Sequence, residues 1–191
     1  MTKAILGSVL SVLLLSAPAL ASWQNKSSPT GQQEVRTELP NSKQIELFHR
    51  STVALPQVIA AAKNQGAGKL IDVTFDVSEK RPVYKVRTYQ NNEVWEVAVD
   101  AQSGLFVDYG TNIPPDQLHE DDKAELAELQ QAKVTLSQAV ATAEEKVGGK
   151  AMSAGLEAAN GGVNYEIIVV LQTALARKVT VDLTTGKLVE N

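Results

Sequence analysis

The six residues LSQAVA at positions 136–141 repeat the pattern LPQVIA at positions 55–60, which lie 81 residues earlier. The same offset relates Tyr84 to Tyr165, and beyond that point the offset becomes 82. A one-residue insertion in a hairpin turn accounts for the change, because turns accept insertions that would shift the register of a strand. The sequence therefore contains two copies of one structural unit.

Each copy begins with the pattern of an amphipathic helix. Apolar residues recur at helical spacing in both copies: Leu55, Val58, Ile59 and Ala62, then Leu136, Ala139, Val140, Ala143 and Val147. Thr135 and Gln138 have the spacing of a capping box, which satisfies free N–H groups at a helix start. Gly148 then supplies the left-handed conformation that ends many helices. We therefore predict one helix at the start of each copy.

Alternating apolar and polar residues follow each helix and predict three short strands per copy. In the first copy the inward residues are Ile71, Val73, Phe75, Val77, Tyr84, Val86, Thr88, Trp95, Val97 and Val99. In the second copy they are Met152, Ala154, Leu156, Tyr165, Ile167, Val169, Val179 and Val181. One helix laid on one face of each sheet buries this apolar surface. We expect an α+β fold of two repeats, each a helix packed on an antiparallel β-meander. Whether the repeats share a sheet stays open.

The chain divides into five segments. Lys3, an apolar run and Ala19-Leu20-Ala21 predict a signal peptide over residues 1–21, cleaved before Ser22. Polar residues predict a flexible leader over 22–50. Repeat 1 spans 51–109, an acidic connector 110–133 and repeat 2 134–191. The connector is expected to be helical, with Asp116 as a cap and with Leu118, Leu126 and Leu129 on its apolar face.

Composition excludes several classes of function. The chain has 191 residues, a net charge of −4 and no cysteine. The absence of cysteine excludes thiol catalysis, zinc–thiolate sites and lipid attachment at a lipoprotein cysteine. An acidic chain offers no basic surface to nucleic-acid phosphates. The apolar run is too short for a comfortable membrane span, so we expect no stable membrane insertion after cleavage. The predicted location is the periplasm or the medium.

Two acidic features resemble metal sites, and both have simpler explanations. Asp100 and Asp182 each precede a glycine by four positions, and aspartate commonly bonds the backbone of such a turn. Their neighbours supply none of the further carboxylates that a calcium loop needs. The cluster of residues 119–122, His119 followed by three acids, fits the positive end of a helix dipole. We predict no metal site, no cofactor and no catalytic site.

Two groups of outward residues are candidates for a partner surface. Ile168 and Val170 make one strand apolar on both faces, which a solvated strand does not require. Either the connector or the first repeat covers this pair, which is the favoured interpretation, or a partner does.

The second group consists of Lys85, Arg87 and Tyr89 on the outer face of the first repeat. The simpler interpretation here is cross-strand pairing of the two cations with Asp72, Asp76 and Glu96.

Both copies resemble the PepSY domain of exported bacterial proteins and of thermolysin-like propeptides. The resemblance rests on the helix starts above, on the strands at Tyr84 and Tyr165, and on the turns that end at Gly104 and Gly186. Two departures are Ala54 in place of the capping Thr135 and Arg177 in place of Trp95.

The resemblance implies a non-enzymatic module that binds a protein or peptide. A role as peptidase inhibitor or modulator is the leading hypothesis. The alternative is a structural or sensory accessory subunit of a cell-envelope complex.

Overall fold

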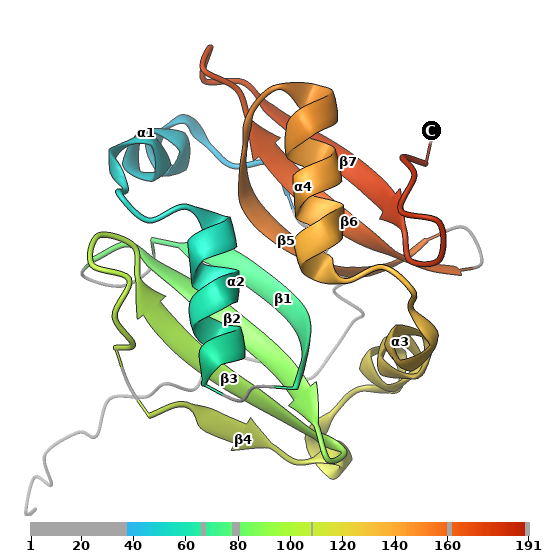
Figure 1. Ribbon diagram of the computed structural model, residues 1–191. Helices are drawn as coiled ribbons and strands as arrows, with labels where there is room; N and C mark the ends of the chain where they lie inside the picture. Colours follow the sequence, from blue (N-terminus) through green and yellow to red (C-terminus); the bar gives the residue numbers. More distant parts are fainter. Residues whose placement is uncertain (1–37, 66–67, 78–80, 108, 160–161, 190–191) are drawn as a thin grey trace, which may run out of the picture. The chain divides into compact units, whose positions relative to one another are not determined.

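The computed structural model describes residues 38–191 except 66–67, 78–80, 108, 160–161 and 190–191 (Figure 1). The expected signal peptide and the leader up to residue 37 lie outside the described residues. The helices are α1 (Ser42–Arg50), α2 (Leu55–Asn64), α3 (Glu120–Gln131) and α4 (Leu136–Val147), with a short 3₁₀ helix at Pro115–Gln117. The strands are β1 (Lys69–Asp76), β2 (Val83–Gln90), β3 (Glu93–Asp100), β4 (Thr111–Ile113), β5 (Lys150–Ala159), β6 (Gly162–Val170) and β7 (Ala176–Asp182).

The two repeats share one antiparallel sheet of seven strands, in the order β4-β3-β2-β1-β5-β6-β7 (Figure 1). The repeats meet where β1 pairs with β5, with Val73 opposite Ala154 at the middle of the ladder. Each repeat contributes its first strand to this junction. The α+β class and the meander of each repeat are confirmed, and the open question of a common sheet is answered.

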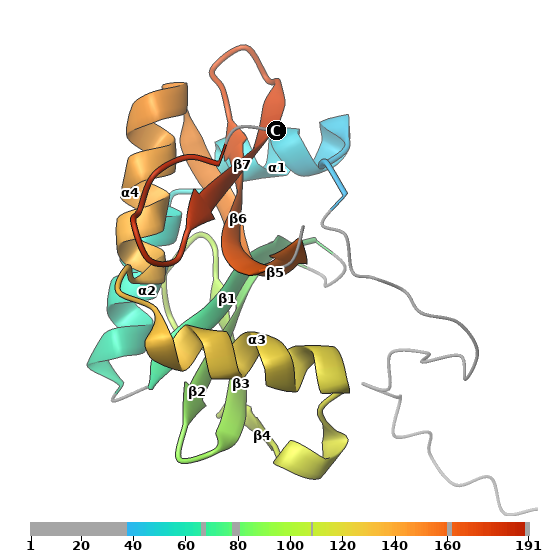
Figure 2. The same ribbon diagram turned by 90° about the vertical axis from the view of Figure 1, so that its right-hand side faces the viewer.

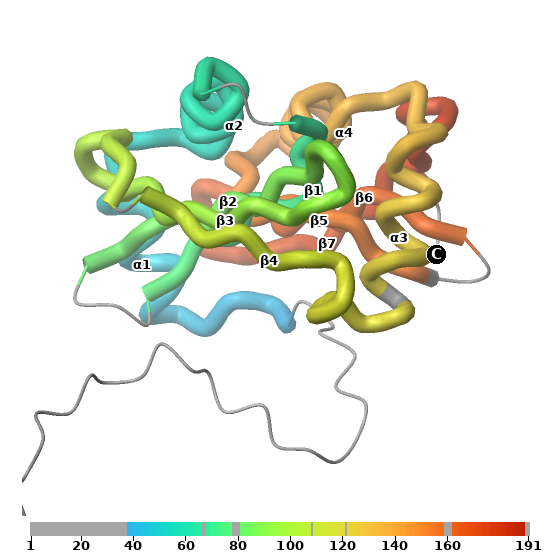
Figure 3. The backbone as a smooth tube through the Cα atoms, turned by 90° about the horizontal axis from the view of Figure 1, so that it is seen from below, coloured from blue at the N-terminus to red at the C-terminus, as the bar shows by residue number. Residues whose placement is uncertain are grey.

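Helices α2 and α4 cover one face of the sheet (Figures 2 and 3). Every residue of the two predicted helical stripes is buried except Val147, which is half-buried. Thr135 Oγ1 accepts a hydrogen bond from the Gln138 amide, and the Gln138 side chain accepts one from the Thr135 amide. At the start of α2, Ala54 offers no side-chain acceptor, and Gln57 alone caps the Ala54 amide at 2.8 Å.

Residues 42–50 form helix α1, which corrects their assignment to a flexible leader. Asn41 and Gln44 make reciprocal capping hydrogen bonds of 2.9 and 3.0 Å. Ile45 and Phe48 are buried in the common core, and the Phe48 ring meets Phe75 edge to face at 5.5 Å. The composition of the segment is polar because only one narrow side of this short helix is buried. Helix α1 lies on the face opposite α2 and α4 (Figures 2 and 3).

The connector contains the expected helix, α3, which runs crosswise to the strands (Figure 2). Its start differs from the expectation, because His119 is the N-cap and Asp116 belongs to the preceding 3₁₀ helix. Asp122 accepts a hydrogen bond from the His119 amide at 3.1 Å. Leu126 and Leu129 are buried in the core. The Lys69 ammonium binds the carbonyl oxygen of Leu129 at 3.1 Å, where the helix dipole is negative.

Candidate functional site

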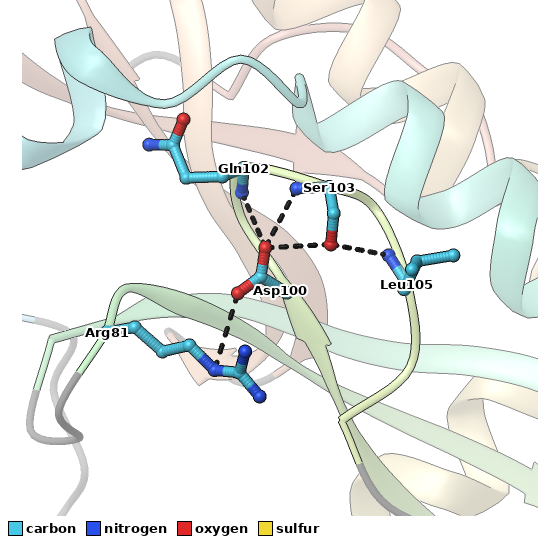
Figure 4. A network of polar contacts seen from close by, with 5 residues as sticks. All are labelled: Arg81, Asp100, Gln102, Ser103 and Leu105. Atoms are coloured by element: carbon cyan, nitrogen blue, oxygen red, sulfur yellow. Dashed lines mark hydrogen bonds and ion pairs between the residues drawn. The ribbon is translucent and has the colours of Figure 1, made fainter.

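The Asp100 and Asp182 carboxylates are turn-forming groups. Asp100 Oδ1 accepts hydrogen bonds from the amide of Gln102 and from the amide and hydroxyl of Ser103, at 2.8–3.1 Å (Figure 4). Gly104 then has a φ of 71°, which an L-residue side chain resists. The Ser103 backbone and hydroxyl bonds lower the pKa of Asp100. This is the turn geometry that the spacing predicts.

The second repeat reproduces this turn. Asp182 Oδ1 accepts bonds from the Thr184 amide and from the amide and hydroxyl of Thr185. Those bonds, the Thr185 hydroxyl first, lower the pKa of Asp182. Gly186 has a φ of 69°. Within the described residues, no group of three or more acidic or histidine side chains is arranged to hold a metal ion.

Lys85, Arg87 and Tyr89 lie on β2 as expected, and each contacts a neighbour within the sheet. Lys85 makes an ion pair with Asp76. Arg87 Nε lies 3.9 Å from Glu96 Oε2, and the Tyr89 hydroxyl donates to Asn92 at 2.9 Å. The cross-strand pairing of the two cations is thus present.

Arg87 is part of a polar row that crosses the outer face of six strands. Successive members face one another in the strand ladders: Glu96, Arg87, Asp72, Gly155, Glu166 and Thr180. Lys178 adds an ion pair to Glu166 at 2.9 Å. Arg87 Nε and Glu166 Oε1 are buried and make no hydrogen bond to the described residues. The row therefore holds charges that are only partly compensated.

Asp72 in this row and Glu125 on α3 bind protons more tightly than usual. Burial raises the pKa of Asp72 from 3.8 to about 6, although Arg87 and a hydrogen bond from Thr74 oppose the rise. Burial also raises the pKa of Glu125 on α3 to about 7, helped by the negative charge of Asp122. The positive charge of Arg87 lowers the pKa of both acids, but by less than burial raises it. The chemistry that this arrangement supports is reversible protonation near neutral pH.

The structure buries Ile168 and Val170, the other candidate pair for a partner surface. Each is only 2% exposed, so neither is available to a partner in this conformation. Val170 lines a cavity of about 370 Å³ together with Phe48 and His49 of α1 and with residues 51–54. Val170 thus faces a cavity that the start of the first repeat and α1 also line. Helix α1 was not among the expected neighbours of this strand, because its residues were assigned to the leader.

Sequence reasoning named Asp72 and Glu96 but missed Glu125 and Glu166. The charge of Arg87 acts on Glu125 only because α3 crosses the sheet. No local pattern in the connector reveals that crossing. Glu166 had a signal that was available. It is an acid two positions before Ile168, on the same face of the strand that the sequence marks as apolar on both sides.

Comparisons with known proteins concern the fold and the family. The family model described as "Peptidase propeptide and YPEB domain", PepSY, matches residues 53–108 and 133–190. A candidate lipoprotein from Clostridium difficile 630 has 15% identity and a TM-score of 0.39, over 70% of this chain and 87% of that chain. The YpmB protein from Bacillus subtilis has 17% identity and a TM-score of 0.30, over 70% and 92%. No curated protein matches. In the described ranges, no helix has the length and apolar character that crossing a membrane requires.

Proposed function

The chain belongs to the PepSY family, and from this membership we propose that it is an exported module that binds a peptidase and modulates its activity. PepSY domains are generally propeptide or inhibitor modules without catalytic groups of their own. The observation that carries the proposal is the duplication. Two PepSY segments form one continuous sheet, so a single rigid framework spans both.

In this proposal the chain acts by covering part of the peptidase, and it neither makes nor breaks a bond. Two lysines of the outer face support this view, because they are paired within the fold. Lys85 pairs with Asp76, and Lys178 pairs with Glu166. Of the two acids with raised pKa, Asp72 accepts a hydrogen bond from the Thr74 hydroxyl within β1, and Glu125 lies on α3.

The proposal includes export through a signal peptide cleaved before Ser22. The support is the small-residue motif at 19–21 after a short apolar run. N-terminal sequencing of the exported protein tests it. We expect the sequence to begin at Ser22. An intact Met1 in a membrane fraction would contradict cleavage.

The binding proposal is tested with the mature chain and a thermolysin-like metallopeptidase. The rate of hydrolysis of a fluorogenic peptide is followed while the mature chain is added, and gel filtration detects the complex. We expect the rate to fall with dose and the chain to be recovered uncleaved. A serine peptidase serves as the control for non-specific inhibition. Unchanged rates together with the absence of a complex would overturn the proposal.

A further inference from the structure

The last strand of the first meander is covered on its far side. Strand β4 pairs with β3, with Val94 opposite Ile113, Trp95 opposite Asn112 and Glu96 opposite Thr111. Closer to the turn, the chain that leaves β3 folds back, and Val99 pairs with Phe106. Two successive contacts therefore cover the edge of β3.

The corresponding strand of the second repeat, β7, has the first of these contacts. Val181 pairs with Leu188, as Val99 pairs with Phe106. The Val189 amide donates to the Thr180 carbonyl at 2.9 Å, as the Val107 amide donates to Ala98. By the offset of 82, residues 176–178 of β7 correspond to residues 94–96 of β3, which pair with β4 in repeat 1. Among the described residues, no strand pairs with β7 there.

The backbone of these positions is oriented to accept a strand. The carbonyl of Thr180 and the amide of Asp182 both bond on the side away from β6. Alternate residues of a strand direct their backbone groups to the same side. The N–H and C=O groups of Ala176 and Lys178 therefore also point away from β6, as those of Glu96 do toward β4.

From these observations we propose that residues 176–178 of β7 receive an extended segment of the partner protein, which adds an antiparallel strand to the sheet. The inference rests on the proposed protein-binding function and names the binding site. Strand addition of this kind uses main-chain hydrogen bonds for affinity and side-chain contacts for specificity. The precedent within the molecule is β4, which occupies the same position in repeat 1.

The side chains indicate that the segment is acidic. Arg177 stands where repeat 1 has Trp95, so it adds an exposed positive charge to this edge, whereas Lys178, in place of Glu96, is paired with Glu166. Arg177 is exposed, and it forms no ion pair within the described part of the chain. A carboxylate directly opposite Arg177 is a favourable cross-strand pair.

Apolar side chains flank the same edge. Leu175 is 61% exposed just before β7, and Val189 is 38% exposed where the covered part of the edge ends. Exposed apolar residues at both ends suit a segment that has an apolar residue beside its acid. If the charge at this edge served only to prevent self-association of the sheet, the exposed apolar side chains beside it would not be needed.

The edge of β7 at residues 176–178, called the slot from here on, is tested by lengthening the mature chain after Asn191. The added residues are Gly-Thr-Glu-Ile-Pro, which copy residues 110–114 with glutamate at the position that faces Arg177. Tethering supplies a high local concentration of the strand. We expect hydrogen exchange of the Lys178 and Ala176 amides to slow at least tenfold relative to the unextended chain. Unchanged exchange would overturn the slot.

A matched extension, Gly-Thr-Lys-Ile-Pro, tests the charge. We expect this extension to slow exchange of the same amides several-fold less than the glutamate version. Equal protection by the two extensions would overturn the acidic character of the segment.

The last arm separates this inference from the proposed function. Ala176→Pro removes an amide that points away from β6, and Arg177→Glu reverses the exposed charge. Each should weaken the peptidase complex at least tenfold, whereas Lys63→Glu, an exposed change in repeat 1, should not. Binding unaffected by both changes would overturn the site but not the function. Docking of the tethered strand without any peptidase complex would overturn the function but not the slot.

Discussion

Val73 lies opposite Ala154 in the β1–β5 ladder, and the two residues are each other's counterparts in the repeat. Their neighbours follow the same symmetry. Asp72 faces Gly155, the counterpart of Thr74, and Thr74 faces Ser153, the counterpart of Asp72. A local two-fold relation therefore passes between β1 and β5. The junction has the self-complementary form of a homodimer interface, but it lies within one chain.

The junction predicts a coupled pair of substitutions. A Cβ atom on Gly155 would lie 2.6 Å from Asp72 Oδ2, so Gly155→Thr should destabilise the fold by about 1–3 kcal/mol through overpacking. Asp72→Ser combined with Gly155→Thr recreates the Ser–Thr pairing found on the other side of the axis. We expect the double variant to recover at least about 1 kcal/mol of the loss. Urea unfolding of all four proteins measures the coupling, and strict additivity would contradict it.

The raised pKa of Asp72 predicts that the free energy of unfolding falls as pH rises. Its folded pKa of about 6 lies above the usual value of 3.8, so the folded state holds the proton more tightly. Stability from this group is therefore complete below pH 4 and is lost between pH 4 and pH 6. Displacement of the pKa by this amount corresponds to about 3 kcal/mol. Asp72→Asn keeps an acceptor for the Thr74 hydroxyl and should remove this loss.

The check is the free energy of unfolding of Asp72→Asn and of the original chain between pH 4 and pH 8. The advantage of the variant should grow with pH and level off above pH 6. Glu125 is present in both proteins, so its titration cancels from the difference. A difference that does not change with pH would contradict the role of Asp72.

The two glycines at the hairpin turns predict matched losses of stability. Gly104 and Gly186 have φ values of 71° and 69°, which a β-branched residue resists. Gly104→Val and Gly186→Val should each cost about 1–3 kcal/mol. Gly186→Val should cost more, because a Cβ there lies 3.2 Å from Val134, against 3.5 Å from Val53 at Gly104. Gly162→Val, in open space without a positive φ, is the control in thermal melting.

The buried tyrosine hydroxyls predict a second matched pair. Tyr84 donates to the Val53 carbonyl at 3.1 Å, and Tyr165 donates to the Val134 carbonyl at 3.0 Å. Replacing either tyrosine by phenylalanine removes a hydrogen bond between the sheet and the segment that leads into a helix. Each change should cost about 1 kcal/mol. Tyr89→Phe, at a more exposed position, should cost less than about 0.5 kcal/mol, and three equal losses in urea unfolding would refute the assignment.

Burial of β6 on both faces predicts that charges there are not tolerated. Ile168→Lys combined with Val170→Glu should cost several kcal/mol, because the buried charges lack partners. Leu175→Lys, at a residue that is 61% exposed, should leave the melting temperature nearly unchanged. A double variant that melts normally would show that β6 is open to a partner after all.

The order and faces of the elements could be predicted because periodicity is local. Alternation at Val73 and Phe75 and helical spacing at Val140 and Ala143 each depend on a few neighbouring residues. The junction could not be predicted in this way. The alternation in β1 says which face is buried but not which strand lies beside it, and β5 follows only after about eighty residues.

Helix α1 and the raised pKa values of the two acids could not be predicted, for related reasons. The Asn41–Gln44 capping box is visible in the sequence, but the helix buries only Ile45 and Phe48, too few for a clear stripe. Glu125 looks like a solvated residue of an acidic helix until α3 is laid across the sheet. Its environment is a product of tertiary packing.

The two sides of the β1–β5 junction belong to one chain, so the junction is free of a constraint that symmetric assemblies obey. In a homodimer, every residue beside the axis occurs twice, so an acid at position 72 would bring a second buried carboxylate into the same ladder. Here Ser153 takes the second place, and Gly155 leaves room for the single acid. Duplication within one chain thus lets the two positions beside the axis differ, and it places one carboxylate at the centre of the sheet where a homodimer would place two that repel each other.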